Sequence, residues 1–428
     1  MFNIVLSDLL KEIIGRCSLF LWEVHLCLLP VHISVLKKDR LILRPHLFMY
    51  FVFSVPKYPR TAKPSPMLQQ LKKLSLFALL LVSQILFAQS DKEKALAKLR
   101  EGIELMDDGK YEESIKALEE GQKLNPDLLD FPYEMAYAHY LQKDYKTAIR
   151  LLEKLTSRKD VIPAVFQLLG NSYDYLEQPD KALEVYDAGL RKFPNSGMLH
   201  LEKGNVYWIK KDYAKALPFY EKGIEVDPRF PSNYYRAARI YLSSNNEIWG
   251  MLYGEIFMNL ERNSKRTAEI SELLFDTYKK EIKFTSDTSM TVSFCQQMTM
   301  DVSALKDPKN IKLPYCFIYE PTLMLALDME KKIDLVSLNR IRTRFLEFYF
   351  KQGFNKTYPN VLFDYQQKVK DAGHLDAYNT WLLQMGDEEG FEKWRSDNEN
   401  KWDNFIKWFA DNQMKVDNNN RFHSTQYN

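Results

Sequence analysis

The sequence predicts an all-α protein: a superhelix of paired helices, followed by a mostly helical C-terminal region. Glycine is scarce, with 15 in 428 residues, and apolar residues make up 46% of the chain against 27% for charged residues. This is the composition of a globular protein rather than a disordered or collagen-like one. A second observation is an internal repeat of 34 residues, and a fixed period of this length indicates stacked structural units.

The repeat begins just beyond residue 90 and places small residues at fixed points of each unit. The first small column holds Gly102, Ala136, Gly170 and Gly204, and the second holds Ser114, Ala148, Ala182 and Ala216. Small side chains allow two helix backbones to approach where they cross. Proline closes three of the units, at Pro126, Pro194 and Pro228. Because proline lacks an amide hydrogen and clashes with the preceding turn, it ends a helix. We therefore expect each unit to be a pair of antiparallel helices.

Four units follow this pattern clearly. They span 95–128, 129–162, 163–196 and 197–230, and their period and residue types resemble the tetratricopeptide repeat (TPR) family. A fifth unit at 231–264 keeps a first helix of the same kind, but its second helix has Gly250 and Gly254 at the small and aromatic columns and no closing proline. We expect residues 91–264 to form a TPR superhelix of four clear repeats and one degenerate repeat.

The C-terminal region, residues 265–428, carries no such period. Apolar spacing predicts helices at 270–278, 335–350, 360–370, 375–384 and 391–409, and alternation predicts a short strand around 290–294. We expect a helical domain that caps the superhelix, because the last exposed face of a solenoid needs a polar cover. The final helix is rich in aromatic residues, for which packing in a core is favoured over a binding surface: Trp394, Trp402, Phe405, Trp408 and Phe409.

The segment 67–88 has the three parts of a bacterial-type signal peptide. Lys72 and Lys73 form a positive start, residues 74–82 an apolar centre, and Ala88 a small residue at a cleavage point. A transmembrane helix is the alternative, but the apolar run is short for one, since a span needs about 20 apolar residues. The sequence therefore predicts a periplasmic or secreted protein with no stable membrane span after removal of the signal.

Residues 1–66 contain two apolar stretches with neither a clean helical nor a clean strand period. We expect translation to start at Met67, which would make residues 1–66 a non-native extension produced by a misplaced start. The alternative is a genuine extension that anchors the protein to a membrane.

The sequence offers little sign of catalytic or metal chemistry. It has no HExxH, GxSxG or Walker motif, and none of its four cysteines forms a CxxC pair. We expect no enzyme activity, no cofactor and no metal site. The net charge of +2 is +5 for residues 1–66 and +2 for residues 67–88, which leaves −5 for residues 89–428. This acidic body lacks the basic footprint that nucleic-acid binding requires.

The TPR resemblance implies a right-handed superhelix whose first helices line a concave groove, with positions 2, 5, 9, 12 and 13 of each repeat facing it. Carried onto this sequence, these positions give an aromatic and amide-rich set: Tyr133, Tyr137, Tyr140, Gln167, Asn171, Asp174, Tyr175, Asn205, Trp208, Tyr235 and Arg239. Aromatic residues are enriched at interfaces, and an asparagine amide can both donate to and accept from a peptide backbone. Leu99 stands where chaperone-binding TPRs carry a lysine of their carboxylate clamp, which argues against binding of an acidic C-terminus.

These observations predict an exported scaffold or adaptor that binds an extended peptide or a partner protein in its groove. One alternative is that some groove aromatics pack against the C-terminal region folded back on them. A second is that residues 265–428 form an enzyme or ligand-binding module to which the repeats recruit substrate. The sequence predicts neither the partner nor the oligomeric state.

Cys295 and Cys316 would meet an oxidising compartment if the chain is exported. The flanking stretches 290–294 and 314–319 look extended, and a disulfide closing this loop would stabilise the fold by about 3 kcal/mol. Two separate buried thiols are the other possibility, and the absence of a spacing signature favours them.

Overall fold

The computed structural model describes residues 77, 91–286, 289–295, 313–327 and 330–427. It divides the chain into two units, 1–79 and 80–428, and the description that follows concerns the second. The predicted extension at 1–66 and signal peptide at 67–88 lie outside the described residues, apart from Phe77. No helix within the described ranges combines the length and the hydropathy needed to cross a membrane.

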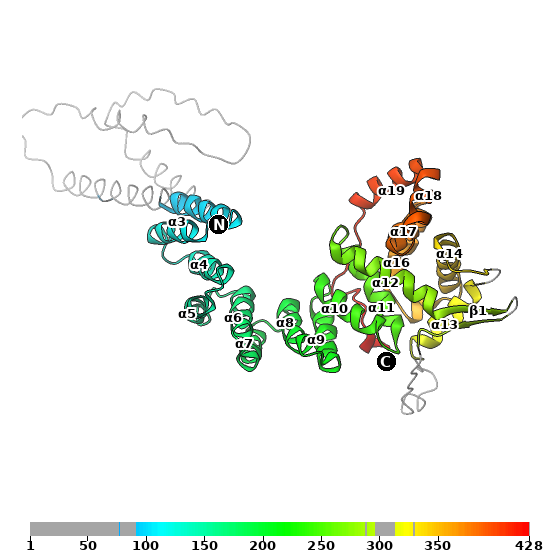
Figure 1. Ribbon diagram of the computed structural model, residues 1–428, viewed down its shortest axis with the longest axis horizontal. Coiled ribbons are helices and arrows are strands. Elements are labelled where there is room, and N and C mark those ends of the chain that lie inside the picture. Colours follow the sequence, from blue (N-terminus) through cyan, green and yellow to red (C-terminus); the bar gives the residue numbers. More distant parts are fainter. Residues whose placement is uncertain (1–76, 78–90, 287–288, 296–312, 328–329, 428) are drawn as a thin grey trace, which may run out of the picture. The chain divides into compact units, whose positions relative to one another are not determined.

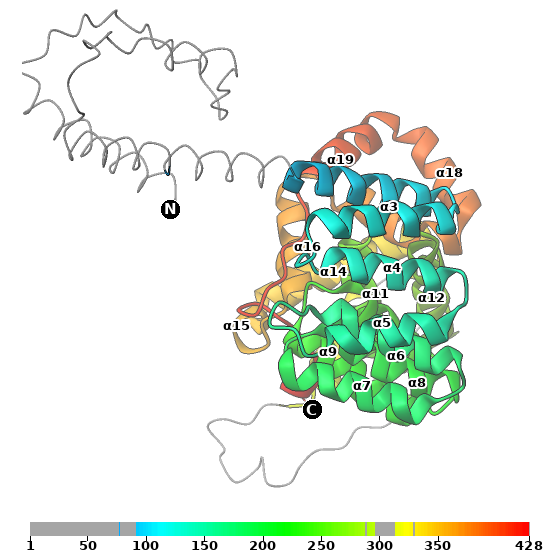
Figure 2. The same cartoon turned by 90° about the vertical axis from the view of Figure 1, so that its left-hand side faces the viewer.

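Five helical hairpins follow one another in chain order from residue 91, as the repeat predicts (Figure 1). The first pairs a helix over residues 91–107 with α3 (Tyr111–Leu124). The other four are α4 (Asp130–Leu141) with α5 (Tyr145–Leu155), α6 (Pro163–Tyr175) with α7 (Pro179–Lys192), α8 (Gly197–Ile209) with α9 (Tyr213–Val226), and α10 (Pro231–Leu242) with α11 (Glu247–Leu260). Figure 2 shows α3, α4 and the following hairpins stacked one below another.

The turn inside each of the first four hairpins repeats the same backbone conformation. Gly109, Lys143, Glu177 and Lys211 lie 34 residues apart, and their φ angles of 76°, 65°, 58° and 58° fall in the left-handed region. In the fifth hairpin the turn is held differently, because Asn246 forms a bridge with Cys295 and the Glu247 amide donates to the carbonyl of Phe294 at 2.8 Å. The degenerate repeat is therefore joined to the C-terminal region at its turn.

The small columns do the packing expected of them. Ala148, Ala182 and Ala216 are fully buried. In the third and fourth repeats the glycines admit a tyrosine ring from the second helix, since a Cβ on Gly170 would lie 2.1 Å from Tyr186 and one on Gly204 would lie 2.4 Å from Tyr220.

Helix α11 marks the change from repeat to C-terminal region. Every residue from Glu247 to Asn259 is buried, as expected for a helix that is apolar all round and lies inside a core. It packs against α10 on the repeat side and against α12 (Lys265–Glu281) and α16 (Val361–Asp371) on the other.

The C-terminal region is mostly helical, as predicted. After α12, strands β1 (Ile282–Ser286) and β2 (Ser289–Val292) pair antiparallel, with Lys283 opposite Thr291. The remaining elements are α13 (Cys316–Ala326), α14 (Leu335–Lys351), α15 (Phe354–Thr357), α16, α17 (Leu375–Leu383), the 3-10 turn η3 (Gln384–Gly386), α18 (Glu388–Asp397), α19 (Glu399–Asp411) and the 3-10 turn η4 (Ser424–Gln426).

Two predictions about this region were wrong. The single helix expected at 391–409 is two helices, because Asn398 leaves the helical conformation and its side chain donates to the carbonyl of Trp394 at 2.9 Å. The stretch 314–319, expected to be extended, contains the start of α13. The core assignment of the aromatic residues there holds: Phe405 and Phe409 are buried, and the three tryptophans are partly buried against the same core.

Cys295 and Cys316 form a disulfide, with their Cα atoms 6.3 Å apart. The interpretation that the sequence favoured, two separate thiols, was therefore wrong. The first turn of α13 brings Cys316 to the residues that follow β2, a proximity that depends on tertiary packing and has no signature in the cysteine spacing.

Candidate binding cleft

A cleft of about 240 Å³ opens along the first helices of the second to fifth repeats. It is lined by residues of α4, α6, α8 and α10, with one residue from α7: Tyr140, Asn171, Asp174, Tyr175, Tyr186, Glu202, Asn205, Val206, Trp208, Ile209 and Arg236. Six of the eleven groove residues expected from the sequence lie in it: Tyr140, Asn171, Asp174, Tyr175, Asn205 and Trp208.

Two asparagines in this cleft are held in the same way, one repeat apart. The hydroxyl of Tyr186 donates to the Asn171 side-chain oxygen at 2.5 Å, and the hydroxyl of Tyr220 donates to that of Asn205 at 3.1 Å. Burial raises the pKa of both tyrosines, so both hydroxyls remain protonated donors. The glycine before each asparagine makes this possible, because it leaves room for the tyrosine ring.

Fixing the side-chain oxygen also fixes the amide nitrogen, which then serves as a donor. The nitrogen of Asn205 donates to Glu202 at 3.0 Å. Within the described residues, the nitrogen of Asn171 has no hydrogen-bond partner. Asn171 therefore presents two N–H groups at the cleft, which suit the carbonyl oxygens of another chain.

Aromatic side chains line the α4 and α6 side of the cleft. Tyr140 meets Tyr175 edge to face, with their centroids 5.7 Å apart, and Tyr175 stacks on Tyr145 at 5.0 Å. Tyr137 stacks on Tyr140 at 6.3 Å. Despite these contacts Tyr175 is 62% exposed and Tyr137 is 37% exposed. The cluster thus leaves ring surface accessible, which a partner can bury.

The charges of the cleft are separated. Asp174 and Glu202 supply carboxylates, and Arg236 supplies a guanidinium that lies 4.8 Å from the centre of the Trp208 ring. Glu202 accepts hydrogen bonds from Gln167 at 2.7 Å and from Asn205. Burial raises the pKa of the Asp174 carboxyl, an effect that the nearby Lys210 partly opposes.

The structure places the other five predicted residues outside this cleft. Tyr133, Tyr137 and Gln167 lie on the lining helices α4 and α6. Tyr235 and Arg239 both contact α12: Tyr235 is buried and donates to Glu269 at 2.6 Å, and Arg239 pairs with the same carboxylate at 3.0 Å. At these two positions the C-terminal region packs on the groove: Tyr235 is buried, whereas Arg239 is held by Glu269 and keeps 33% of its side chain exposed.

Sequence reasoning missed five lining residues. Glu202 and Arg236 occupy position 6 of their repeats, next to a position that the family pattern includes. Their 34-residue spacing was a usable signal, as was that of Tyr186 and Tyr220, each fifteen residues after an asparagine. The other two, Val206 and Ile209, are apolar.

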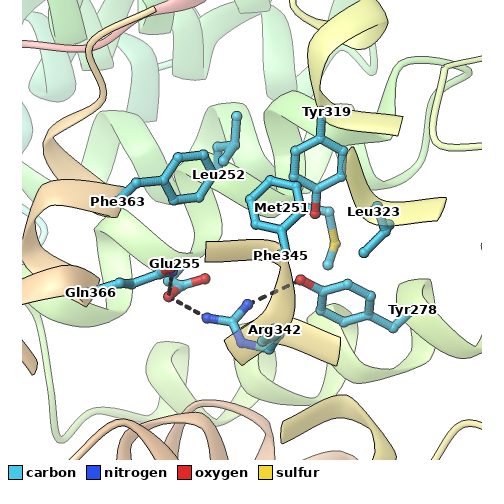
Figure 3. A pocket seen from close by; sticks show the side chains of 10 residues that line it. All are labelled: Met251, Leu252, Glu255, Tyr278, Tyr319, Leu323, Arg342, Phe345, Phe363 and Gln366. Atoms are coloured by element: carbon cyan, nitrogen blue, oxygen red, sulfur yellow. Dashed lines mark hydrogen bonds and ion pairs between the residues drawn. The ribbon is translucent and has the colours of Figure 1, made fainter. Parts of the chain in front are cut away.

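A polar cluster in the C-terminal region is the other candidate for a site (Figure 3). Arg342 of α14 pairs with Glu255 of α11 at 2.7 Å and donates to Tyr278 of α12 at 3.0 Å, and Gln366 of α16 donates to Glu255 at 2.6 Å. Burial alone would lower the pKa of Arg342, but Glu255 and the neighbouring tyrosines raise it, so the arginine stays charged.

These side chains satisfy one another and leave little space. The cavity beside them measures about 20 Å³, on the order of one water molecule. The cluster therefore joins helices rather than enclosing a substrate. Among the residues that the structure describes, no group of three or more histidine, cysteine or acidic side chains is placed to hold a metal ion.

Comparison with known proteins agrees with the repeat. Residues 99–160 and 168–234 match the model of the tetratricopeptide repeat family. A stretch of 54 residues is 43% identical to tetratricopeptide repeat protein 21A of Mus musculus, and this match spans 13% of this chain and only 4% of the mouse protein.

Three similar solved structures each match less than half of this chain. A TPR protein of Thermus thermophilus is 20% identical with a TM-score of 0.36, covering 42% of this chain and 98% of its own. PilF of Pseudomonas aeruginosa is 16% identical with a TM-score of 0.38, covering 45% and 86%. YrrB, described as a TPR protein with an unusual peptide-binding site, is 18% identical with a TM-score of 0.29, covering 42% and 92%. On the family match and the helical hairpins together, residues 99–160 and 168–234 of this chain are tetratricopeptide repeats.

Proposed function

We propose that this protein is an exported TPR scaffold that binds an extended peptide segment of a partner protein in the cleft between its second and fifth repeats. The observation that carries the proposal is the repeated pair of tyrosine and asparagine, Tyr186 with Asn171 and Tyr220 with Asn205. An extended peptide exposes carbonyl oxygens at regular intervals, and side chains fixed before binding lose less conformational entropy when they meet them.

Export is supported by two independent features. The segment 67–88 reads as a signal peptide. The disulfide between Cys295 and Cys316 is of the kind that persists in the periplasm or outside the cell.

The alternative, an enzyme or ligand-binding module in residues 265–428, gains no support from the Arg342 cluster. Its polar groups are bound to one another, and the adjoining cavity of about 20 Å³ is far smaller than the roughly 300 Å³ or more of a typical ligand pocket. We therefore propose a binding role for the protein and a structural role for this region.

The test is a selection of random nonapeptides displayed on phage against the purified chain, followed by fluorescence anisotropy on the enriched peptides. Replacing both cleft asparagines (Asn171→Leu with Asn205→Leu) should weaken binding about tenfold or more. Tyr186→Phe should weaken it about fivefold, because it removes one orienting hydrogen bond of about 1 kcal/mol. Asn418→Leu, a change at an exposed asparagine outside the cleft, is the control and should leave affinity unchanged.

Two results would count against the proposal. One is a selection that enriches no peptide over the unrelated protein used as background. The other is a set of peptides that bind the asparagine variant as well as the parent chain.

A further inference from the structure

The two carboxylates of the cleft, Asp174 and Glu202, form no ion pair within the described residues, unlike several buried or half-buried carboxylates elsewhere in the chain. Glu261 pairs with Arg266, and Glu330 pairs with both Arg340 and Arg344. Within the described residues, neither Asp174 nor Glu202 has a lysine or arginine at ion-pair distance, although both line the cleft. Lys210 lies near enough to Asp174 to oppose part of the effect of its burial, but it forms no ion pair with this carboxylate. The cleft therefore holds two carboxylates with which no described lysine or arginine pairs directly.

Glu202 is held in place by neutral groups. Gln167 of α6 donates to one of its oxygens at 2.7 Å, and Asn205 of α8 donates to the other at 3.0 Å. These amides fix the carboxylate between two repeats but leave its charge intact, and each oxygen retains a further lone pair for another donor. The geometry is that of a preorganised acceptor for a cation.

The Asp174 carboxylate is a second acceptor. No side chain among the described residues donates a hydrogen bond to it. It is partly buried, and that burial makes its charge unfavourable. A cation placed beside it would relieve this cost, because an opposite charge stabilises the ionised carboxylate.

The aromatic side chains of the cleft suit the same kind of ligand. An aromatic ring attracts a cation placed over its face, most strongly when both are removed from water. Trp208 already shows this chemistry, with Arg236 at 4.8 Å and Arg239 at 5.0 Å from its ring centre. Tyr140 and Tyr175 offer rings on the side of the cleft that Asp174 shares, since Asp174 and Tyr175 are neighbours in α6.

The positive charge of Arg236 favours one orientation of a basic ligand in the cleft. Its guanidinium has no ion-pair partner among the described residues, so the α10 end of the cleft is positive while the α6 side is negative. A basic side chain of the bound segment is therefore attracted to the α6 side and repelled from the α10 end.

We infer that the cleft selects peptide segments carrying a lysine or arginine, whose charged group is held by Asp174 and Glu202 beside the rings of Tyr140 and Tyr175. The inference rests on the proposed function and deepens it, because it names the class of peptide. The peptide inferred here is basic, whereas chaperone-binding TPRs take an acidic C-terminus. Leu99, which replaces the clamp lysine of those TPRs, already argues against an acidic ligand.

The experiment compares three pools of fluorescein-labelled nonapeptides that are random except at the central residue, which is lysine, methionine or glutamate. Titration of the purified chain is followed by fluorescence anisotropy. The lysine pool should bind at least tenfold more tightly than the methionine pool, and the glutamate pool should bind more weakly than both.

Isosteric variants then remove the charges without changing the shape of the side chains. In Asp174→Asn combined with Glu202→Gln, the lysine pool and the methionine pool should bind with equal affinity, because the charge that distinguishes them is gone. Asp174→Asn alone breaks no side-chain hydrogen bond of the described chain, and should lower lysine-pool affinity about fivefold even if the double variant folds poorly. Asp180→Asn, at an acid on α7 outside the cleft lining, is the matched control and should change nothing.

The outcomes separate this inference from the proposed function. Equal binding of the lysine and methionine pools to the parent chain overturns the basic-residue preference while peptide binding stands. Lysine-pool binding that survives in Asp174→Asn and in the double variant overturns the assignment of these carboxylates. Failure of all three pools to bind overturns the proposed function itself.

Discussion

The repeats and the C-terminal region are both helical, but they are held together over very different distances along the chain. From one repeat to the next, side-chain bonds join neighbours: Gln167 to Glu202 across 35 residues and Asn233 to Gly197 across 36. The C-terminal region instead reaches back to α11 of the degenerate repeat: Arg342 bonds to Glu255 across 87 residues and Tyr378 bonds to it across 123. A solenoid of the first kind is close to a sum of nearest-neighbour contacts, whereas long-range contacts of the second kind form or break together.

The difference bears on where binding can evolve. A substitution in a locally connected repeat perturbs that repeat and its neighbours, so the cleft residues can vary without unfolding the rest. In the C-terminal region one polar cluster joins four helices, and changing it threatens all of them.

The largest effect is expected for Arg342→Met. It leaves Glu255 buried without its counter-charge, and breaking a buried ion pair in this way costs about 3–5 kcal/mol. Hydrogen exchange should show α11, α14, α16 and α17 losing protection together, while α4 to α7 keep theirs. Arg342→Met combined with Glu255→Met removes both charges and should recover part of the loss. An equal loss of protection in α4 to α7 would contradict the proposed difference between the two regions.

Loss of the disulfide is expected to come next. Cys295→Ala with Cys316→Ala opens a loop between residues 21 apart and should lower the free energy of unfolding by about 3 kcal/mol. Thermal unfolding with and without a reducing agent measures it. The reductant should lower the Tm of the parent chain to that of the variant and leave the variant unchanged. A reductant-insensitive Tm in the parent chain would show that the bond contributes no stability.

The smallest effect of the three is expected inside a repeat. In Gly170→Ala the new Cβ would lie 2.1 Å from the Tyr186 ring, and overpacking of this kind costs about 1–3 kcal/mol. Hydrogen exchange should report the damage in α6, α7 and the adjoining helices only.

The second repeat supplies the matched rescue for this change. It carries Ala136 and Leu152 at the positions of Gly170 and Tyr186, and both are fully buried. Gly170→Ala with Tyr186→Leu should therefore regain most of the lost stability. A double variant as unstable as the single one would mean that the Ala136–Leu152 pair of the second repeat cannot replace the Gly170–Tyr186 pair of the third.

Periodicity explains why the repeats could be predicted from the sequence. The columns at Gly102 and Ser114 recur every 34 residues, and they predict the hairpins. The family positions that the TPR resemblance carries onto these repeats include six residues that line the cleft. Asn171 and Asn205 follow from the same rule. The hydrogen bonds that orient them involve the second helix of each repeat, a contact that the family positions do not describe.

The differences come from contacts with segments beyond the clear repeats. Tyr235 and Arg239 occupy groove positions, but Glu269 of the later helix α12 bonds to both of them. The pairing of Cys295 with Cys316 likewise depends on how α13 packs beside the end of β2. Such contacts depend on how α12, α13 and β2 pack, and the columns of the clear repeats do not describe these elements.

The tail that follows α19 has a consequence for how this protein matures. Glu221 lies buried in the fourth repeat and accepts hydrogen bonds from Tyr241, Tyr253 and Ser424. The two tyrosines leave the ribosome soon after it, but Ser424 follows 203 residues later, beside Phe422, which covers Trp249. A chain truncated by proteolysis or by early termination after α19 would keep its repeats and leave this carboxylate and this tryptophan uncovered. The residues after α19 thus complete the core of the fourth and fifth repeats, which the repeats alone leave open.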